Sequence, residues 1–152
     1  MQNDEKMMRR CLSLGRGALQ NGDYPVGSVI VIDGKIVAEG IESVKAKNDP
    51  TAHAEIEAIR QACRKSGTLD LSAATLFSNV EPCWMCAYPI LRTQIQRVVF
   101  GLANEKVGWF STKFAELDGK KTEFTAKVLE TECRKLNDEL YRLNKKLKKV
   151  ND

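Results

Sequence analysis

Apolar residues recur at intervals of three and four residues in three segments of this chain, and this period predicts amphipathic helices. The segments cover residues 4–20, 52–67 and 126–149. The last has the most regular pattern, because its apolar positions alternate in steps of four and three. These positions are Leu129, Cys133, Leu136, Leu140, Leu143 and Leu147. Such a seam can form one half of a helix pair, but we expect it to pack on a sheet.

Short apolar runs lie between the helical segments and predict strands, the first at residues 26–32. An Asp-Gly pair at 33–34 follows this run and is typical of a tight hairpin. Residues 35–42 are therefore expected to form an antiparallel partner strand. The other expected strands cover residues 74–80 and 95–101, with a possible last strand in "KTEFT", residues 121–125.

Two further helices are expected between the strands. Residues 82–94 begin with Pro82, which suits a first helical turn, while Pro89 is expected to kink or shorten the helix. Residues 105–117 are also expected to be helical, and residues 43–50 to form a polar loop. Because strands alternate with helices, we predict an α/β sandwich with a mostly parallel sheet.

The chain has 152 residues, of which 43% are hydrophobic and 29% charged. These values predict a single globular domain over residues 1–152. The longest apolar run, residues 29–32, is far too short to cross a membrane, and the N-terminus lacks the apolar region of a signal peptide. A cytoplasmic protein without a membrane partner is expected. The net charge of +4 permits a polyanionic partner without requiring one.

The five cysteines are odd in number, and cytosolic thiols stay reduced, so no disulfide framework is predicted. Cys11, Cys63 and Cys133 lie in helical patterns, where we expect them to pack as small apolar residues. Cys83 and Cys86 instead form a C-x-x-C pair near the start of a predicted helix. One helical turn separates them, so both sulfur atoms face the same side.

The only histidine of the chain, His53, also lies near the start of a predicted helix. One imidazole and two thiolates, from His53, Cys83 and Cys86, form a ligand set that zinc accepts. No second histidine exists and no other cysteine has ligand-like spacing, so a fourth position is left for water, as in catalytic zinc sites. Helix N-termini favour anions, which helps the thiols to bind as thiolates.

Glu55 lies two residues after His53, where it suits proton transfer beside a zinc-bound water rather than ligation. Each motif alone has a simpler explanation, since H-x-E can lie on a helix surface and C-x-x-C can be a redox pair. Pro82 before the first cysteine and the upstream H-x-E argue against the redox pair. Together, H-A-E and P-C-x-x-C match the signature of zinc nucleobase deaminases.

Through "DPTAHAEIEAIR", "EPCWMC" and "IQRVVFG" the chain resembles the cytidine deaminase-like superfamily, in the branch of guanine, cytosine and tRNA adenosine deaminases. The resemblance covers most of the chain. It implies a three-layer α/β/α sandwich on a five-stranded mixed sheet, a homodimer, zinc ligands at His53, Cys83 and Cys86, and Glu55 as proton shuttle. The implied reaction is hydrolytic: an exocyclic amine of a heterocycle becomes a carbonyl, and ammonia leaves.

The resemblance also implies substrate-binding positions. Val26 matches a residue that lines the family pocket. Backbone N–H groups beside Ala54 and Cys83 are suited to hold the ring and its developing charge. Glu81, the first residue of "EPCWMC", is assigned to the same pocket.

One departure from the family concerns Glu42, which stands where these relatives place a substrate-binding asparagine. Asparagine donates and accepts hydrogen bonds, whereas ionised glutamate only accepts them. Our hypothesis is that the substrate presents N–H donors at that edge, as an amino-rich heterocycle would. The alternative is a one-residue shift in the loop 43–50 that leaves Glu42 outside the pocket.

Two other features point to different substrates. Trp109, Phe110 and Phe114 could cap a small pocket and stack on a planar base, although each alone is more simply a core residue. As a group they favour a closed site for a free base over an open cleft for RNA. A basic run near the C-terminus could instead contact phosphates, or could be a solvated helix end. It comprises Arg142, Lys145, Lys146, Lys148 and Lys149.

The sequence therefore predicts a zinc-dependent aminohydrolase acting on a small free heterocyclic base, guanine-like or cytosine-like. A tRNA adenosine deaminase, which forms inosine at the wobble position, is the first alternative. A non-catalytic binding module on the same fold is the second. The presence of Glu55 beside a complete ligand set argues against that module, because a structural zinc site does not require the carboxylate.

Overall fold

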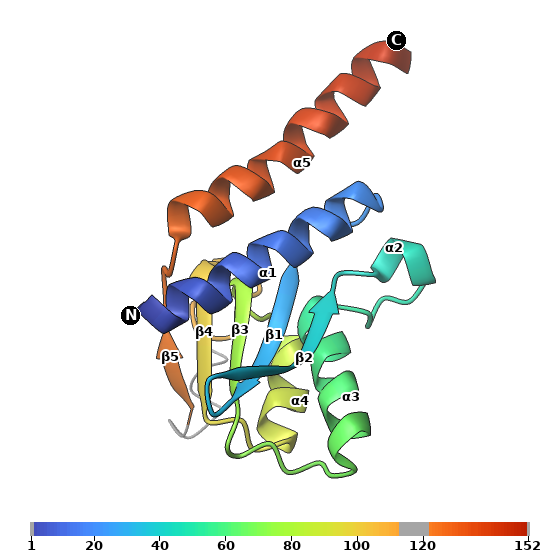
Figure 1. Cartoon of the computed structure of the whole chain (residues 1–152). Coiled ribbons are helices and arrows are strands. Elements are labelled where there is room, and N and C mark those ends of the chain that lie inside the picture. The colour runs from blue at the N-terminus through green and yellow to red at the C-terminus, as the bar shows by residue number, and fades with distance from the viewer. Residues whose placement is uncertain (1, 113–121, 152) are drawn as a thin grey trace.

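The computed structural model of the chain describes residues 2–112 and 122–151, which form a five-stranded sheet with helices on both faces (Figure 1). The elements in chain order are α1 (Gln2–Gln20), β1 (Gly27–Ile32), β2 (Lys35–Ile41), α2 (Val44–Lys47), α3 (Ala54–Ser66), β3 (Thr75–Val80), α4 (Trp84–Arg92), β4 (Arg97–Leu102), β5 (Glu123–Thr125) and α5 (Glu130–Asn151). No helix among these described residues is long and apolar enough to cross a membrane.

The sheet has the strand order β2-β1-β3-β4-β5 and is mixed. Strand β1 pairs antiparallel with both β2 and β3, while β3, β4 and β5 run parallel. The five-stranded mixed sheet is confirmed. The tight turn of Asp33 and Gly34, with positive φ angles of 50° and 71°, joins β1 and β2 as the expected hairpin. Two of the four strand pairings are parallel, fewer than the mostly parallel sheet that we expected, because β1 lies between β2 and β3 and runs opposite to both.

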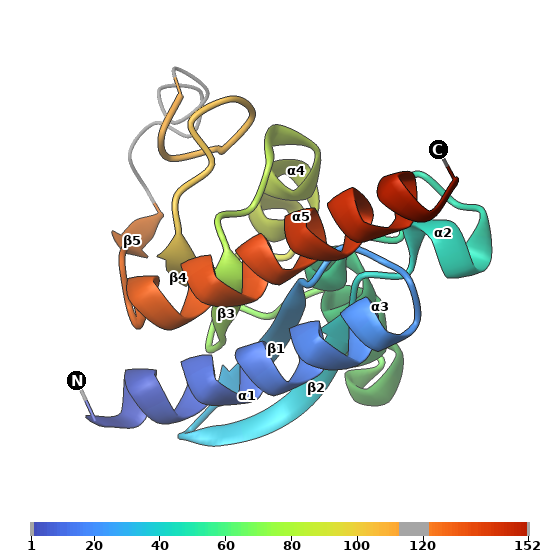
Figure 2. The same cartoon turned by 90° about the horizontal axis from the view of Figure 1, so that it is seen from above.

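Two apolar layers fill the space between the sheet and its helices. Successive residues of β1 point to opposite faces, so Ile30 joins the core beneath α3 and α4, while Val29 and Val31 join the core beneath α1 and α5. Cys11 and Cys133 are fully buried in the second layer, as small apolar residues would be. Figure 2 shows α1 and α5 lying side by side on this face of the sheet.

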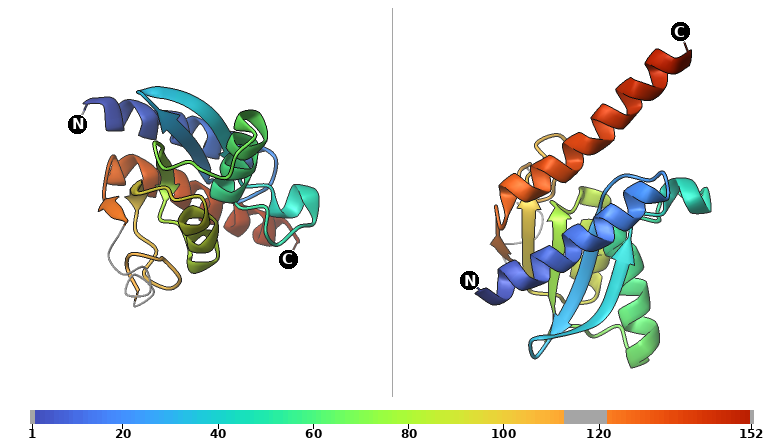
Figure 3. Two further views of the ribbon diagram at one scale, coloured as in Figure 1. Left: turned by 90° about the horizontal axis from the view of Figure 1, so that it is seen from below. Right: turned by 45° about the horizontal axis from the view of Figure 1, so that its top comes forward.

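Helix α5 begins at Glu130, four residues later than the apolar pattern indicates. Lys127 and Leu129 have left-handed backbone conformations, with φ angles of 63° and 54°, which a helix does not allow. The first half of α5 packs over α1 and β4, where Leu136 is buried. Beyond Leu140 the helix extends past the body of the protein, and Leu143 is 46% exposed (Figure 3).

Residues 105–112 form turns rather than the expected helix, and residues 113–117 of that prediction lie outside the described part of the chain. Backbone hydrogen bonds tie these turns to the start of α4: Trp84 N–H donates to Val107 O at 3.1 Å, and Trp109 N–H donates to Pro82 O at 2.8 Å. These partners lie more than twenty residues away in sequence, so local helix propensity does not decide this segment.

Candidate active site

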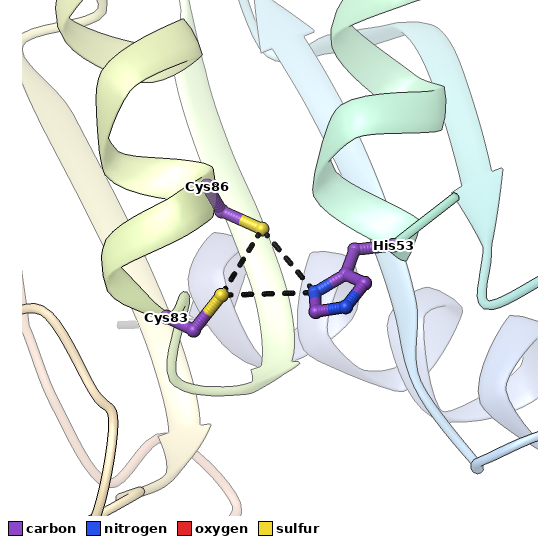
Figure 4. A group of neighbouring side chains, drawn as sticks. All are labelled: His53, Cys83 and Cys86. Carbon is purple, nitrogen blue, oxygen red and sulfur yellow. Dashed lines mark hydrogen bonds between the residues drawn. The ribbon is translucent and has the colours of Figure 1, made fainter. Parts of the chain in front are cut away.

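The three predicted ligands come from the N-termini of two helices that pack side by side. His53 is the N-cap residue of α3 and Cys83 is the N-cap residue of α4, both with extended backbones. Cys86 follows in the first turn of α4. Figure 4 shows the imidazole and the two sulfur atoms pointing toward one another across the gap between these helix starts.

The loop before His53 is shaped by Asp49. Its carboxylate accepts hydrogen bonds from the Thr51 backbone N–H at 2.8 Å and from the Thr51 hydroxyl at 2.7 Å. This local turn, together with the rigid ring of Pro50, ends the polar loop and directs the chain into α3. The Asp-Pro pair thereby places the imidazole at the helix start.

The distances between the three donor atoms fit a zinc ion. His53 Nδ1 lies 3.7 Å from Cys83 Sγ and 3.6 Å from Cys86 Sγ, and the two sulfur atoms are 3.7 Å apart. A tetrahedral ion with Zn–S bonds of about 2.3 Å and Zn–N bonds of about 2.0 Å requires donors about 3.5–3.8 Å apart. These residues can therefore hold zinc together.

The electrostatics of the cluster also suit a cation. The contact with Cys86, helped by the His53 ring, lowers the pKa of the Cys83 thiol to about 4 against the effect of burial. The same sulfur contact, together with burial, raises the pKa of Cys86. The hydrogen bond with Cys83 raises the pKa of His53 to about 9. Binding of a metal requires a neutral imidazole and two thiolates, so it releases protons from this cluster.

Glu55 is the second residue of α3 and is 3% exposed. Its Oε1 accepts a hydrogen bond from the Ser78 hydroxyl at 3.2 Å, and its Oε2 lies 3.7 Å from Cys86 Sγ. Burial raises the pKa of this carboxyl group. The carboxylate thus lies beside the ligand cluster without belonging to it, at the place where proton transfer to a bound water requires a base.

His53, Cys83 and Glu55 open into one pocket of about 410 Å³, while Cys86 is buried behind them. It is lined by Tyr24, Val26, Glu42, Val44, His53, Glu55, Val80, Glu81, Cys83, Asn104, Val107 and Asn137. A hydrolytic enzyme needs such a concave site, with a few convergent polar groups on an otherwise apolar wall.

Comparison with known proteins identifies the architecture. Residues 1–102 match the family model described as the cytidine and deoxycytidylate deaminase zinc-binding region. The chain belongs to this deaminase family. It is a hydrolytic deaminase of a zinc-binding family, and His53, Cys83 and Cys86 are the residues that can hold the metal.

Individual relatives of this deaminase differ in substrate. It is 41% identical to the tRNA-specific adenosine deaminase of Haemophilus influenzae over 126 residues, 82% of this chain and 73% of that protein. It is 45% identical to the guanine deaminase of Bacillus subtilis over 85 residues, 55% and 54% of the two chains. A solved structure of a tRNA:A34 deaminase has a TM-score of 0.82 and 32% identity, and the match covers 86% of this chain and 98% of that one.

In this deaminase Glu42 lies in the pocket. Its position agrees with the hypothesis that Glu42 faces the substrate, and not with the alternative that a shift in the loop 43–50 leaves it outside. Its Oε2 accepts a hydrogen bond from the Ala54 backbone N–H at 3.1 Å, and its Oε1 lies 3.9 Å from His53 Nε2. The Ala54 N–H is therefore engaged by a carboxylate, although we had expected it to hold the substrate ring. Burial raises the pKa of Glu42 to about 7.

Glu81 reaches the pocket wall, but its carboxylate is directed to a loop. It accepts hydrogen bonds from the Asn104 N–H at 2.8 Å, the Ser111 N–H at 2.7 Å and the Ser111 hydroxyl at 2.6 Å. The carboxylate thereby fastens the segment 104–111 against the start of α4. No motif in the sequence indicates this role, because the partners lie more than twenty residues away.

The three aromatic residues expected to cap the pocket, Trp109, Phe110 and Phe114, have different outcomes. Trp109 is 1% exposed and packs edge-on against Phe124, with 4.9 Å between ring centroids, so it is a core residue rather than a residue of the pocket wall described above. Phe114 lies outside the described residues. Phe110 is 47% exposed and packs beside Phe124 as well.

Several pocket residues were missed by sequence reasoning. Val26 was expected there, but its neighbour Tyr24 was not, and neither was Asn137 of α5. Tyr24 adjoins the "PVG" stretch that suggested Val26, and this adjacency was the only available signal. Asn137 lies on a helix far from every motif in the sequence, and nothing local marks it.

Proposed function

We propose that this deaminase acts on adenosine in transfer RNA, converting it to inosine with release of ammonia. The observation that carries this proposal is the structural match to a tRNA:A34 deaminase over 98% of that chain. The tRNA-specific relative from Haemophilus influenzae supports it over a similar span. These matches favour the tRNA substrate over the free base that the aromatic residues first suggested.

The residues of the site suit the chemistry of such a reaction. His53, Cys83 and Cys86 would hold zinc, which when bound makes water acidic enough to act as a nucleophile near neutral pH. Glu55 would take one proton from the attacking water and pass it to the ring nitrogen, and would then take a second proton from the newly added hydroxyl group and pass it to the departing amine, which leaves as ammonia. The Ser78 hydroxyl, which donates to Glu55 at 3.2 Å, holds the carboxylate in place for both transfers.

The decisive experiment measures inosine in unmodified transfer RNA and ammonia release from a panel of free bases and nucleosides. We expect inosine formation in the RNA and little turnover of the free bases. Glu55→Ala is the control and should retain zinc while losing turnover, because the ligands are intact. Rapid turnover of a free base without inosine in RNA would contradict the proposal.

A second candidate substrate is a free heterocycle with N–H donors, such as guanine, and it is favoured by Glu42. In its ionised form, the carboxylate of Glu42 in the pocket accepts hydrogen bonds and donates none. We expect Glu42→Asn to shift preference across the panel away from bases with N–H donors at that edge. Unchanged preference in this variant would rule out a specificity role for Glu42.

The non-catalytic module is set aside, because the chain belongs to an enzyme family. A homodimer and a cytoplasmic location stay predictions.

A further inference from the structure

The rim of the pocket carries an exposed aromatic ring beside a cation. Tyr24 lines the pocket and is 51% exposed, so part of its ring faces solvent at the entrance. The Lys45 ammonium lies 5.0 Å from the centroid of that ring. In residues 2–112 and 122–151 no carboxylate lies within ion-pair distance of Lys45, so its charge is available to a ligand.

The two side chains are held together by a buried carboxylate. Asp23, which is fully buried, accepts hydrogen bonds from the backbone N–H groups of Lys45 at 2.8 Å and Ala46 at 3.0 Å. Because Asp23 directly precedes Tyr24, these bonds fix the loop after α1 to the first turn of α2. The aromatic ring and the cation are therefore positioned before any ligand arrives, which lowers the entropic cost of binding.

A second hollow of about 470 Å³ continues from this rim. Lys45 lines it on one side and Lys146 of α5 on another, with Leu140 and Leu143 among its apolar residues. Lys45 belongs to α2 and Lys146 to α5, so the two lysines come from elements far apart in the sequence. Arg142, on the same half of α5, is exposed as well. The surface beyond the pocket entrance is thus both cationic and partly apolar.

We propose that this rim and hollow bind the RNA strand next to the target nucleotide. This inference rests on the proposed function. The base of a neighbouring nucleotide stacks on Tyr24, and phosphate groups contact Lys45 and Lys146. Single-stranded nucleic acids are bound in this way, by aromatic rings that stack on bases and by cations that follow the backbone. A free base has no phosphate groups, so it would not contact the two lysines in this way.

The test measures binding of an anticodon stem-loop RNA to variants made in the Glu55→Ala background, in which the RNA is not turned over. We expect Tyr24→Ala to weaken binding about tenfold through the lost stacking of one base. Tyr24→Phe should bind like the parent, because it keeps the ring. Lys45→Gln should weaken binding and reduce the slope of log affinity against log salt by about one, as for one lost phosphate contact.

The matched control is Lys35→Gln. Lys35 is also exposed, but it lies in the β1–β2 hairpin at the opposite end of β1 from Val26. We expect it to leave affinity and salt slope nearly unchanged. Circular dichroism and zinc content of each variant check that the fold and the metal site are intact; Lys45→Gln alters only an exposed side chain.

Two results would overturn the inference, and they are distinguishable. If the wild type forms inosine while Tyr24→Ala and Lys45→Gln bind the stem-loop as well as Lys35→Gln does, the RNA follows another path and the proposed function stands. If the wild-type protein neither binds the stem-loop nor forms inosine in it, the proposed function fails and this inference fails with it.

Discussion

At the scale of single residues, two buried carboxylates of the pocket have different tasks because their hydrogen-bond partners differ. Glu42 contacts the α3 start, with Oε2 bonded to the Ala54 N–H and Oε1 facing the His53 ring. Glu81 accepts hydrogen bonds from three donors of the segment 104–111. Residue type and position in a motif suggested substrate binding for both, but Glu81 mainly holds a loop, whereas Glu42 accepts one backbone hydrogen bond and keeps more capacity to accept from a ligand.

Glu81→Ala should therefore loosen the loop beside Cys83. Removing the shared acceptor leaves the Asn104 and Ser111 donors without their partner, so we expect unfolding free energy to fall by about 2 kcal/mol. Zinc affinity, measured by competition with a chelator, should fall too, because the loop is bonded to the start of α4: Trp84 N–H donates to Val107 O, and Trp109 N–H donates to Pro82 O. Urea unfolding provides the stability measurement.

Glu105→Ala is the matched control for this variant, since Glu105 is an exposed residue of the same loop. We expect it to change stability by less than about 0.5 kcal/mol, as exposed substitutions usually do. Equal effects of the two variants would show that the hydrogen bonds of Glu81 do not hold the loop.

At the scale of elements, the site depends on how closely α3 approaches the sheet. A Cβ atom at Gly40 of β2 would overlap the carbonyl oxygen of Ala54 and come within 2.6 Å of the Ala58 backbone nitrogen. Glycine is therefore required at this crossing. Ala54 is the first residue of α3 and lies between His53 and Glu55 in the sequence. The close contact at Gly40 therefore also sets the positions of these two side chains.

Gly40→Ala should destabilise the protein by about 3 kcal/mol, because two backbones must separate to admit one methyl group. It should also reduce zinc content, since α3 moves relative to α4. Gly17→Ala is the control: nothing lies within 4 Å of a Cβ built there, and alanine in a helix should stabilise by about 0.5–1 kcal/mol. Urea unfolding and metal analysis of both variants test this, and a stable, zinc-replete Gly40→Ala protein would contradict it.

The contact between α1 and β2 is predicted to respond to acid. Arg10 donates two hydrogen bonds of 2.7 Å to Glu39, and this pairing lowers the pKa of Glu39 below its usual 4.5. The stabilisation is therefore present above pH 4.5 and is lost as the pH falls through the lower pKa of the folded state. Both side chains are partly exposed, so Arg10→Ala should cost less than about 1 kcal/mol at pH 7.

Unfolding by urea at pH 7 and at pH 3 checks this prediction. The stability difference between Arg10→Ala and the wild type should shrink at the lower pH, because the fraction of protonated Glu39 increases as the pH falls. Arg9→Ala is the control, because Arg9 is exposed and has no ion pair within residues 2–112 and 122–151. A difference that is constant with pH would assign the effect of Arg10 to packing instead.

At the scale of the whole molecule, the ligand cluster joins two helices that the chain connects only through β3. His53 begins α3 and Cys83 begins α4, so a metal held by both would act as a crosslink on that face of the sheet. An ion that binds the folded chain and not the unfolded one adds its binding free energy to the stability.

Removal of zinc by a chelator should therefore abolish turnover and lower the melting temperature. At free zinc about 1,000 times its Kd the stabilisation is about 4 kcal/mol, which corresponds to roughly 10 °C for a chain of this size. Scanning calorimetry with and without zinc measures the shift. Cys86→Ser should reduce it and Glu55→Ala should not, and a melting temperature indifferent to zinc in the wild type would contradict the ligand assignment.

Much of the fold was predictable, because periodic apolar positions report which face of each element is buried. The strands, the Asp33-Gly34 hairpin and α3 occur where their patterns indicate. The segment 105–112 was mispredicted as a helix because its backbone partners, at Pro82 and Glu81, are remote in sequence. The late start of α5 has a local cause, the left-handed conformation of Leu129, that residue type alone does not reveal.

The sequence by itself determined which chemical groups this protein uses: an imidazole, two thiols and a carboxylate. They lie in two short motifs, and within each motif the geometry of a helix start fixes how the side chains are placed relative to one another. Only the tertiary structure decided how these motifs meet, because the meeting depends on strand order and on the packing of α3 beside α4. It also decided that Glu42 faces the pocket, that Glu81 faces a loop and that Tyr24 stands beside Lys45. Each of these arrangements joins residues distant in the chain, and long-range packing, unlike periodicity, leaves no local pattern in the sequence.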